Sequence, residues 1–238
     1  MIKLGSMRDI NLAMWLPIYM DIARRLGLDP ERDRYATRLL DKLACSKVVP
    51  QEDLEQIIQG REVYILGNGP NLPEDLRRNM RAVTRAAVIA ADAASIVYKS
   101  VVGRPPDIVV TDLDGPVHHM LKLNSILVVH AHGDNIHKLR RHVPEIPALH
   151  PTTQVEPIGC VHNYGGFTDG DRAAYLAYAF GASCIKLLGM CFTKPSSYDL
   201  SSRKDIDRKM LKLEIARWLL EHLRRELKAN VVDLSGVC

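Results

Sequence analysis

The sequence has few of the residues that build disulfide frameworks, zinc ribbons or nucleic-acid surfaces. Its five cysteines are scattered and form no Cys-x-x-Cys pair, so we expect neither a zinc ribbon nor a disulfide framework, and we expect a reducing compartment. The aromatic residues are eight tyrosines, three phenylalanines and two tryptophans, which leaves little for a surface that stacks bases. With 32 basic against 28 acidic residues, the net charge of +4 suits an anionic small molecule better than a nucleic acid.

Long apolar segments and targeting signals are also missing from the sequence. No apolar run approaches the roughly 20 residues that span a bilayer, and the N-terminus has no signal-peptide pattern. We therefore expect a cytoplasmic protein without membrane contact. The 238 residues contain no detectable repeat and allow one large α/β domain, or a domain with a small appendage.

The first fifty residues favour helices. Apolar residues at helical spacing predict one helix over residues 15–26, and the dipeptide Asp29-Pro30 begins a second helix that ends near Cys45. We interpret residues 1–50 as a helical N-terminal segment. Residues 51–238 then form a second part, an α/β domain that includes the C-terminal helix.

Short apolar strands alternate with helices from residue 61 onward. We predict strands at residues 63–66, 87–91, 108–111, 126–131 and 184–188. We predict helices at residues 73–81, 93–100, 116–123, 134–141 and 168–180. Near-continuous apolar strands separated by helices are typical of a mostly parallel sheet with helices on both faces, which bind ligands beyond the carboxyl ends of their strands.

The C-terminal segment predicts a helix of about six turns. Its apolar residues step by threes and fours and form one face, while the other face is charged. These apolar residues are Ile206, Met210, Leu213, Ala216, Leu220, Leu223 and Leu227. We expect this helix to dock on the domain or to form part of a homodimer interface.

Two aspartates and a glycine follow the predicted strand 108–111 directly. Alternate residues of an extended segment point the same way, so Asp112 and Asp114 can aim both carboxylates at one spot. Such a pair suits Mg²⁺, with phosphate oxygens completing its octahedron. In the structural alternative, Asp112 caps a helix and Asp114 opens a turn with Gly115. We favour metal binding, because the strand is expected to be buried on both faces.

A glycine-rich turn follows the first predicted strand. Gly67, Asn68 and Gly69 precede a helix, where backbone N–H groups can meet a phosphate. The turn lacks the third glycine of the dinucleotide fingerprint and the Gly-Lys-Ser/Thr of a P-loop, so an ordinary tight turn fits equally well. Asp92 ends the next strand, where it either caps a helix or hydrogen-bonds a ligand.

Histidines end the predicted strand 126–131. His130 and His132 have a spacing that can chelate zinc, but later strands offer no clear further ligand, so contact with phosphate is at least as compatible. Asp134 follows as a metal ligand or as the cap of a helix. In the loop after residue 164, either Thr168 or Asp169 is expected to cap a helix, while the further acid Asp171 suggests a second acidic contribution to the same site.

Basic residues gather in and after residues 191–205. They are Lys194, Arg203, Lys204, Arg208 and Lys209. Such a charged run is usually solvated surface, but beside a triphosphate site it could also close over the anion.

Six motifs, taken in order, resemble the archaeal 6-hydroxymethyl-7,8-dihydropterin diphosphokinases across roughly residues 61–228. They are Ile-Leu-Gly-Asn-Gly-Pro (65–70), Ala-Ala-Asp-Ala (90–93), Val-Val-Thr-Asp-Leu-Asp-Gly (109–115), His-Ala-His-Gly-Asp-Asn (130–135), Gly-Gly-Phe-Thr-Asp-Gly-Asp-Arg-Ala (165–173) and Leu-Gly-Met (188–190). A weaker similarity in the strand-Asp, Asp-x-Asp and Thr-Asp motifs points to the thiamin pyrophosphokinase fold, which is Rossmann-like.

The resemblance implies a reaction and a set of site residues. The primary alcohol of the pterin would attack the β-phosphorus of ATP, AMP would leave, and Mg²⁺ would be required, in tetrahydromethanopterin or folate biosynthesis. Asp112, Asp114 and Asp134 would be the catalytic residues and would hold the metal and phosphates. Further ligand contacts are expected from Gly67, Asn68, Gly69, Asp92, His132, Thr168, Asp169 and Asp171. Cys191 stands where the family pattern has an aspartate, so any role that needs a carboxylate there is in doubt.

Two other functions fit parts of the pattern. A sugar-nucleotide glycosyltransferase could use Asp112-x-Asp114 to hold its metal, and production of AMP from ATP would separate it from a diphosphokinase. A non-catalytic nucleotide-binding module is less compatible, because unpaired carboxylates near phosphates do not help binding by themselves.

Overall fold

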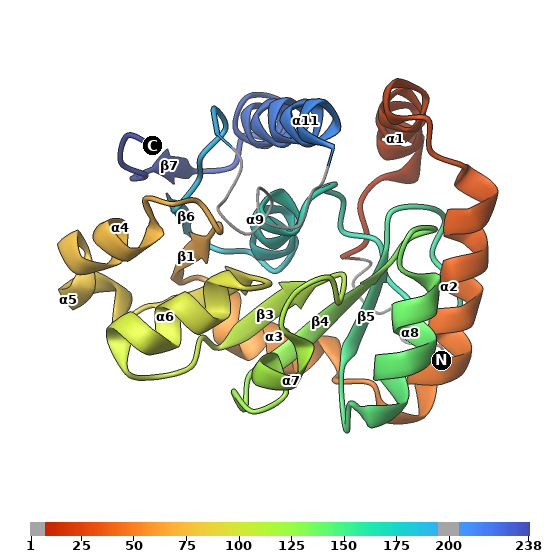
Figure 1. Ribbon diagram of the computed structural model, residues 1–238, viewed down its shortest axis with the longest axis horizontal. Helices are drawn as coiled ribbons and strands as arrows, with labels where there is room; N and C mark the ends of the chain where they lie inside the picture. The colour runs from red at the N-terminus through yellow and green to blue at the C-terminus, as the bar shows by residue number, and fades with distance from the viewer. Residues whose placement is uncertain (1–7, 195–204) are drawn as a thin grey trace.

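A computed structural model describes residues 8–194 and 205–238. Their strands form one seven-stranded sheet in the order β5-β4-β3-β2-β1-β6-β7, with all neighbours parallel (Figure 1). The strands are β1 (Glu62–Leu66), β2 (Ala87–Ala91), β3 (Ile108–Thr111), β4 (Ile126–Ala131), β5 (His150–Thr153), β6 (Cys184–Leu188) and β7 (Val231–Asp233). The predicted α/β class and its parallel sheet are confirmed.

Helices cover both faces of this sheet. In chain order they are α1 (Leu12–Leu26), α2 (Pro30–Ala44), η1 (Cys45–Lys47), α3 (Gln51–Ile58), α4 (Leu72–Arg78), α5 (Met80–Val83), α6 (Ala94–Val102), α7 (Val117–Met120), α8 (Ile136–His142), η2 (Val143–Glu145), α9 (Asp169–Ala179) and α11 (Ile206–Arg225). None of those in the described part of the chain is long and apolar enough to cross a membrane.

Alternate side chains of the strands enter hydrophobic cores on opposite faces, as a pleated strand requires. Val63 and Ile65 of β1 pack with α1, α3, α9 and α11. Tyr64 and Leu66 of the same strand pack with α4, α5 and α6 on the other face. A second core on that face joins β3 and β4 to α2, α7 and α8. The central strands are therefore buried on both sides.

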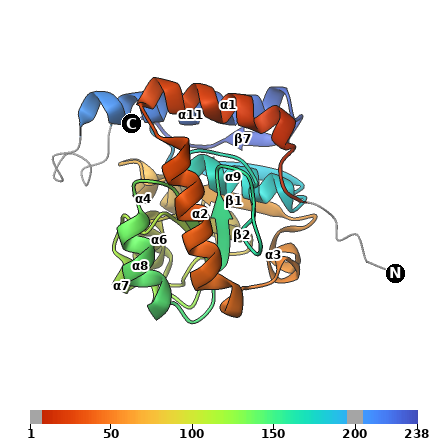
Figure 2. The same cartoon turned by 90° about the vertical axis from the view of Figure 1, so that its right-hand side faces the viewer.

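The two N-terminal helices belong to cores on different faces. α1 buries Trp15 and Tyr19 beside α9 and α11, whereas α2 buries Ala36 and Leu40 beside β4 and α8. Figure 2 shows α1 alongside α11, with α2 running down the edge of the sheet next to β5. The helical character predicted for residues 1–50 is confirmed for the described residues, and the division into two parts at residue 50 stays a prediction.

The sequence did not predict α3, β5 or β7. β5 reads His-Pro-Thr-Thr and lacks an apolar run, yet all four residues are buried. α2 covers it, and both ring nitrogens of His150 find oxygen partners, at Val49 O (2.9 Å) and Tyr164 Oη (2.8 Å). Satisfied polar groups can be buried without an apolar pattern, which explains the omission.

The face predicted for the C-terminal helix is only partly correct. α11 buries Ile215, Ala216, Leu219, Leu220 and Leu223. Its first two turns extend past the core, so that Ile206 is 40% exposed. The apolar repeat continues through the first two turns of α11, so the sequence alone did not show where the helix leaves the hydrophobic core.

The expectation that the cysteines form no disulfides is wrong, because two disulfides are present. Cys45 pairs with Cys160 and Cys191 pairs with Cys238, while Cys184 is a buried free thiol. The partners are 115 and 47 residues apart in the sequence, so only the fold brings them together. The inference of a reducing compartment loses its premise, and Cys191 links the loop after β6 to the C-terminus.

Candidate active site

A cavity of about 640 Å³ opens at the carboxyl edge of the sheet. Its walls come from the loops that follow β1, β2, β3, β4 and β6, from the start of α9 and from the first half of α11. Residues 27–29 between α1 and α2, with Arg32 and Asp33 of α2, also line it. Parallel α/β sheets bind ligands at this edge, and all the site residues that the family resemblance implied line the cavity.

The chain reverses its direction across the sheet between β1 and β6. Here the glycine-rich turn packs against the loop after β6, where the Gly67 and Gly69 N–H groups donate to Leu188 O (2.9 Å) and Gly189 O (2.8 Å). A Cβ atom on Gly69 would lie 2.5 Å from Gly189 O, so only glycine fits. The expected contact between a ligand and these two N–H groups is therefore wrong, although Gly67, Asn68 and Gly69 still line the cavity.

Asp112 and Asp114 reach the cavity from a turn rather than from an extended strand. β3 ends at Thr111, and Leu113 adopts a left-handed conformation with φ of 65°. The Leu113 N–H donates to Thr111 Oγ1 (2.9 Å) and the Asp114 N–H donates to Asp112 Oδ1 (3.0 Å). The predicted proximity to one cavity holds, but strand alternation is the wrong reason for it. A leucine with positive φ is uncommon and is often associated with function.

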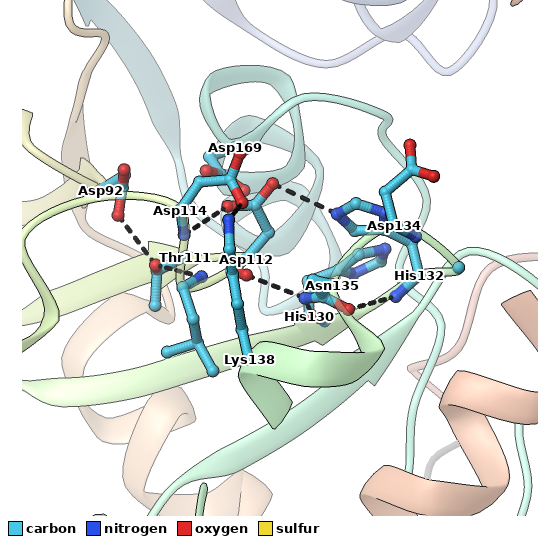
Figure 3. A network of polar contacts seen from close by, with 12 residues as sticks. Asp92, Thr111, Asp112, Asp114, His130, His132, Asp134, Asn135, Lys138 and Asp169 are labelled. Atoms are coloured by element: carbon cyan, nitrogen blue, oxygen red, sulfur yellow. Dashed lines mark hydrogen bonds and ion pairs between the residues drawn. The ribbon is translucent and has the colours of Figure 1, made fainter. Parts of the chain in front are cut away.

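The surroundings of Asp112 keep its carboxylate ionised and fixed. Figure 3 shows Oδ2 facing the His132 ring, 3.2 Å from Nε2. The buried Asn135 donates to Asp112 O (2.8 Å) and accepts the His132 N–H (3.0 Å), which ties the β3 and β4 loops together. Burial opposes ionisation, but His132 and Arg172 outweigh it and hold the pKa of Asp112 well below its usual range.

Two further carboxylates gather with Asp112 in Figure 3. Asp114 forms an ion pair with Lys138 of α8, and Asp169 lies 3.2 Å from Arg172 NH1 at the start of α9. Burial, followed by the negative charge of Asp112, raises the pKa of Asp169 well above its usual range. Three carboxylates therefore share this part of the cavity, each with a cation or an imidazole beside it.

The donor set of Asp112, Asp114 and Asp169 fits a hard divalent cation. All three offer carboxylate oxygens, the ligands that Mg²⁺ prefers, and the cavity leaves room for phosphate oxygens and water. Among the described residues, no three of these acids bring ligand atoms within 4.8 Å of one another. The acids thus line one space without forming a closed protein cage, as expected for Mg²⁺ that is shared with a phosphorylated substrate.

Asp134 does not join this group. Figure 3 shows its carboxylate pointing away from Asp112 and Asp114, and it lies 3.6 Å from Arg208 of α11 with 53% of its side chain exposed. It does not cap α8 either, since Asn135 occupies the cap position. The side chains of residues 112, 114 and 134 therefore do not point to one spot, whereas Asp169 lies beside Asp112 and Asp114 (Figure 3).

Asp171 has a structural role instead of the predicted ligand contact. Its carboxylate accepts the N–H groups of Phe167 (2.6 Å) and Thr168 (2.8 Å) and the Thr168 hydroxyl. Thr168 is the N-cap of α9 and forms a capping box with Asp171. Asp169 follows in the first turn, so this cap aims Asp169 and Arg172 at the cavity.

Asp92 lies on the side of Asp114 that is away from His132 (Figure 3). Its φ is 44°, its Oδ1 accepts the Thr111 hydroxyl (2.8 Å), and a Cβ atom on Gly115 would overlap its carboxylate. Asp92 does not cap α6, because that helix has no side-chain cap. A strained backbone at the mouth of a cavity, fixed by neighbours, is consistent with the predicted ligand contact.

His130 is not at the cavity, although its neighbour His132 is. It is buried with Nδ1 3.1 Å from Thr152 Oγ1. Burial, with Arg172 and His132 nearby, holds the pKa of His130 well below its usual range, so the ring is neutral at pH 7. The two histidines therefore do not form a zinc site.

Asp33 in the N-terminal segment also supports the site, and sequence reasoning missed it. This buried carboxylate accepts hydrogen bonds from the Tyr19 hydroxyl (2.5 Å), Gln154 Nε2 (2.6 Å) and the Gly133 N–H (2.6 Å). Gln154 in turn accepts a hydrogen bond from Arg172 NH2 (2.8 Å). Helices α1 and α2 are thereby connected to the loop that carries His132 and to the start of α9. The partners are up to 121 residues apart, so no local pattern marks them.

Replacing Asp33 with alanine is expected to lower the free energy of unfolding by about 3 kcal/mol, because three buried donors lose a charged acceptor. Urea unfolding followed by circular dichroism measures this change. Tyr19→Phe removes one donor and should cost about 1 kcal/mol. The exposed Asp53→Asn on α3 is the control. A loss below about 1 kcal/mol for Asp33→Ala would contradict this role.

Cations near the acids were also only partly anticipated. Arg208 and Lys209 follow the predicted loop and lie within α11, whereas residues 195–204, with Arg203 and Lys204, lie outside the described part of the chain. Lys212 lines the cavity from the same helix. Burial, joined by the charges of Arg208 and Arg172, lowers the pKa of Lys212, while Asp112 opposes the shift.

Comparison with known proteins assigns the chain to a family. The family model described as "6-hydroxymethylpterin diphosphokinase MptE-like" matches residues 37–195. A protein of Pyrococcus furiosus named 6-hydroxymethyl-7,8-dihydropterin pyrophosphokinase is 40% identical over 233 residues, covering 93% of this chain and 97% of the relative. Relatives of the same name from Methanothermobacter thermautotrophicus and Methanocaldococcus jannaschii are 36% and 33% identical, covering 91% and 92% of this chain and 96% and 98% of their own lengths.

A solved structure shows a much lower similarity. The MAf glycosyltransferase from Magnetospirillum magneticum is 15% identical with a TM-score of 0.43, covering 85% of this chain and 37% of that chain. Similarity at this level says nothing about function. The family model and the relatives, by contrast, extend over most of the chain and include the acidic loops described above. The chain therefore belongs to this family of transferases, the MptE-like 6-hydroxymethylpterin diphosphokinases.

Proposed function

We propose that this protein transfers the diphosphoryl group of ATP to the hydroxymethyl group of 6-hydroxymethyl-7,8-dihydropterin. The alcohol oxygen forms a bond to the β-phosphorus, the bond to the α-phosphate oxygen breaks, the alcohol proton is released, and AMP leaves. The product is a pterin diphosphate ester on the way to tetrahydromethanopterin or folate. The proposal is supported by relatives of that name across 93% of the chain and, above all, by the three carboxylates converging on one cavity.

The residues of the cavity suit this reaction without a covalent nucleophile. Diphosphoryl transfer mainly requires two substrates in line and compensation of phosphate charge. Asp112, Asp114 and Asp169 would hold Mg²⁺, which supplies positive charge to the phosphate oxygens when bound. His132 and Asn135 keep Asp112 in place, and this function is the one we assign to them.

The other walls of the cavity would contact the two substrates in different ways. Ala91, Ala93 and the glycines after β1 and β6 line the cavity together with Asp92, and their small size would leave room for the flat pterin ring. Arg172 fixes Asp169 through NH1 and Gln154 through NH2, so it orients a metal ligand and adds positive charge close to the phosphates.

Incubation with ATP, Mg²⁺ and 6-hydroxymethyl-7,8-dihydropterin tests the proposal. We expect AMP and the pterin diphosphate in equal amounts, with nucleotide and pterin products separated by chromatography. ADP as the product, or no consumption of ATP in the presence of the pterin, would refute it. Parallel incubations with sugar nucleotides and an acceptor mixture should give no turnover, and turnover there would favour a glycosyltransferase.

A further inference from the structure

The cavity has acidic residues in one part of its wall and basic residues in another. The acids Asp112, Asp114 and Asp169 come from loops at the edge of the sheet and from the start of α9, whereas Arg208 and Lys212 come from α11. These two cations are four residues apart, so they lie on one face of the helix, one turn above the other. Figures 1 and 2 show α11 lying beyond α9 as seen from the sheet.

Lys212 differs from the basic residues at the C-terminal end of this helix. On the outer face, Arg224 and Arg225 pair with Glu221 at 2.9 and 2.8 Å. Lys212 faces the cavity, and within residues 8–194 and 205–238 its ammonium group makes no hydrogen bond or ion pair. It is half-buried among Asp112, Asp134, Arg172 and Arg208. The usual explanation for a helical lysine, a solvated outer face, does not apply.

The grouping of cations around Lys212 has an electrostatic cost. Arg172 is 7% exposed and Arg208 is 40% exposed at its side chain, and both repel Lys212. Arg208 is balanced by Asp134 and Arg172 by Asp169. Lys212, by contrast, is attracted at longer range by Asp112 and Asp134. A group with several negative oxygens would balance all three cations at once, and a polyphosphate is such a group.

We propose that Lys212 binds the polyphosphate chain of the nucleotide from the side opposite Asp112. The inference rests on the proposed function, since it takes ATP as the nucleotide, and it adds a residue that neither the motifs nor the metal site contains. The acids and their cation would hold the phosphates from the sheet edge, and the ammonium group of Lys212 would hold them from α11. An ammonium group contacts phosphate as a compact point charge, so its contribution depends on charge more than on shape.

Binding measurements with charge variants test this role. Lys212→Met removes the charge and keeps the chain length, so we expect the Kd for ATP to rise about 10- to 100-fold, as for loss of one charge-assisted contact. The Kd for AMP, which lacks the β- and γ-phosphates, should change less than about threefold, and the KM for the pterin should stay unchanged. Lys212→Arg should recover most of the ATP affinity. Isothermal titration calorimetry gives each Kd, and circular dichroism verifies that the variants fold.

Arg217→Met is the matched control, because Arg217 is an exposed cation on the same helix. We expect it to bind ATP like the wild type. If Lys212→Met also binds ATP and turns over like the wild type, while the wild type converts ATP to AMP, the role of Lys212 is refuted and the proposed function stands. If the wild type makes no AMP with the pterin, the proposed function fails, and the ATP titrations still decide whether Lys212 contacts polyphosphate. Equal weakening of ATP and AMP would point to a structural role and would also overturn the inference.

Discussion

Replacing Asp112 or Asp114 with asparagine is expected to lower kcat/KM for diphosphate transfer by at least about 1000-fold, equivalent to about 4 kcal/mol of transition-state stabilisation. Asparagine keeps the size of the side chain, and at position 112 its amide oxygen can still accept the Asp114 N–H. It removes the negative charge that a divalent cation needs. The change therefore acts on charge and leaves the turn around Leu113 in place.

The turnover assay with purified variants measures this effect, with circular dichroism as the test of folding. Asp53→Asn is the control, because Asp53 is exposed on α3, which leads into the opposite end of β1. Asp114→Asn also leaves Lys138 without its anionic partner, so a small loss of stability is expected there. Wild-type rates in the double variant would rule out a metal role for both acids.

Removing divalent cations is expected to have an effect of similar size. With excess EDTA, diphosphate transfer should fall by at least about 1000-fold, and added Mg²⁺ should restore it. The reason is electrostatic: Asp112, Asp114 and Asp169 line one cavity, and the raised pKa of Asp169 reflects burial and the repulsion by Asp112. Without a cation, the phosphates of ATP would add further negative charge to this space.

Thermal unfolding gives a readout of the same site that does not depend on turnover. Mg²⁺ with a non-hydrolysable ATP analogue should raise the Tm of the wild type, since ligands that bind only the folded state stabilise it. The Asp112→Asn variant should show little shift. EDTA saturated with Mg²⁺ serves as the control for effects of the chelator itself. Full turnover in excess EDTA, after removal of carried-over metal, would contradict a metal-dependent site.

The strand-end motifs were sufficient to locate the cavity but not to assign every residue within it. Asp112, Asp114, His132 and Asp169 were named from the sequence and lie around one space. Asp171 was named with them, although its oxygens are used by the N-terminus of α9. A carboxylate that caps a helix and a carboxylate that binds a ligand follow the same local pattern. Only hydrogen-bond partners distinguish them.

The sequence by itself determined the parallel sheet and the edge at which its motifs meet. Apolar strands that are buried on both faces and separated by helices permit few other architectures, and parallel strands bring their carboxyl ends to one side. These are consequences of local periodicity and chain direction, which can be read without knowledge of the fold.

The tertiary structure alone decided which distant groups became partners. Asp33 with Gln154, Cys45 with Cys160, and Lys212 with the Asp112 side of the cavity are each about 100 or more residues apart in the sequence. Hydrogen bonds, disulfides and charge contacts act over a few ångströms and leave no periodic trace along the chain. The packing of helices on both faces of the sheet set these distances. It thereby brought Asp169 beside Asp112 and placed Lys212 in the lining of the same cavity.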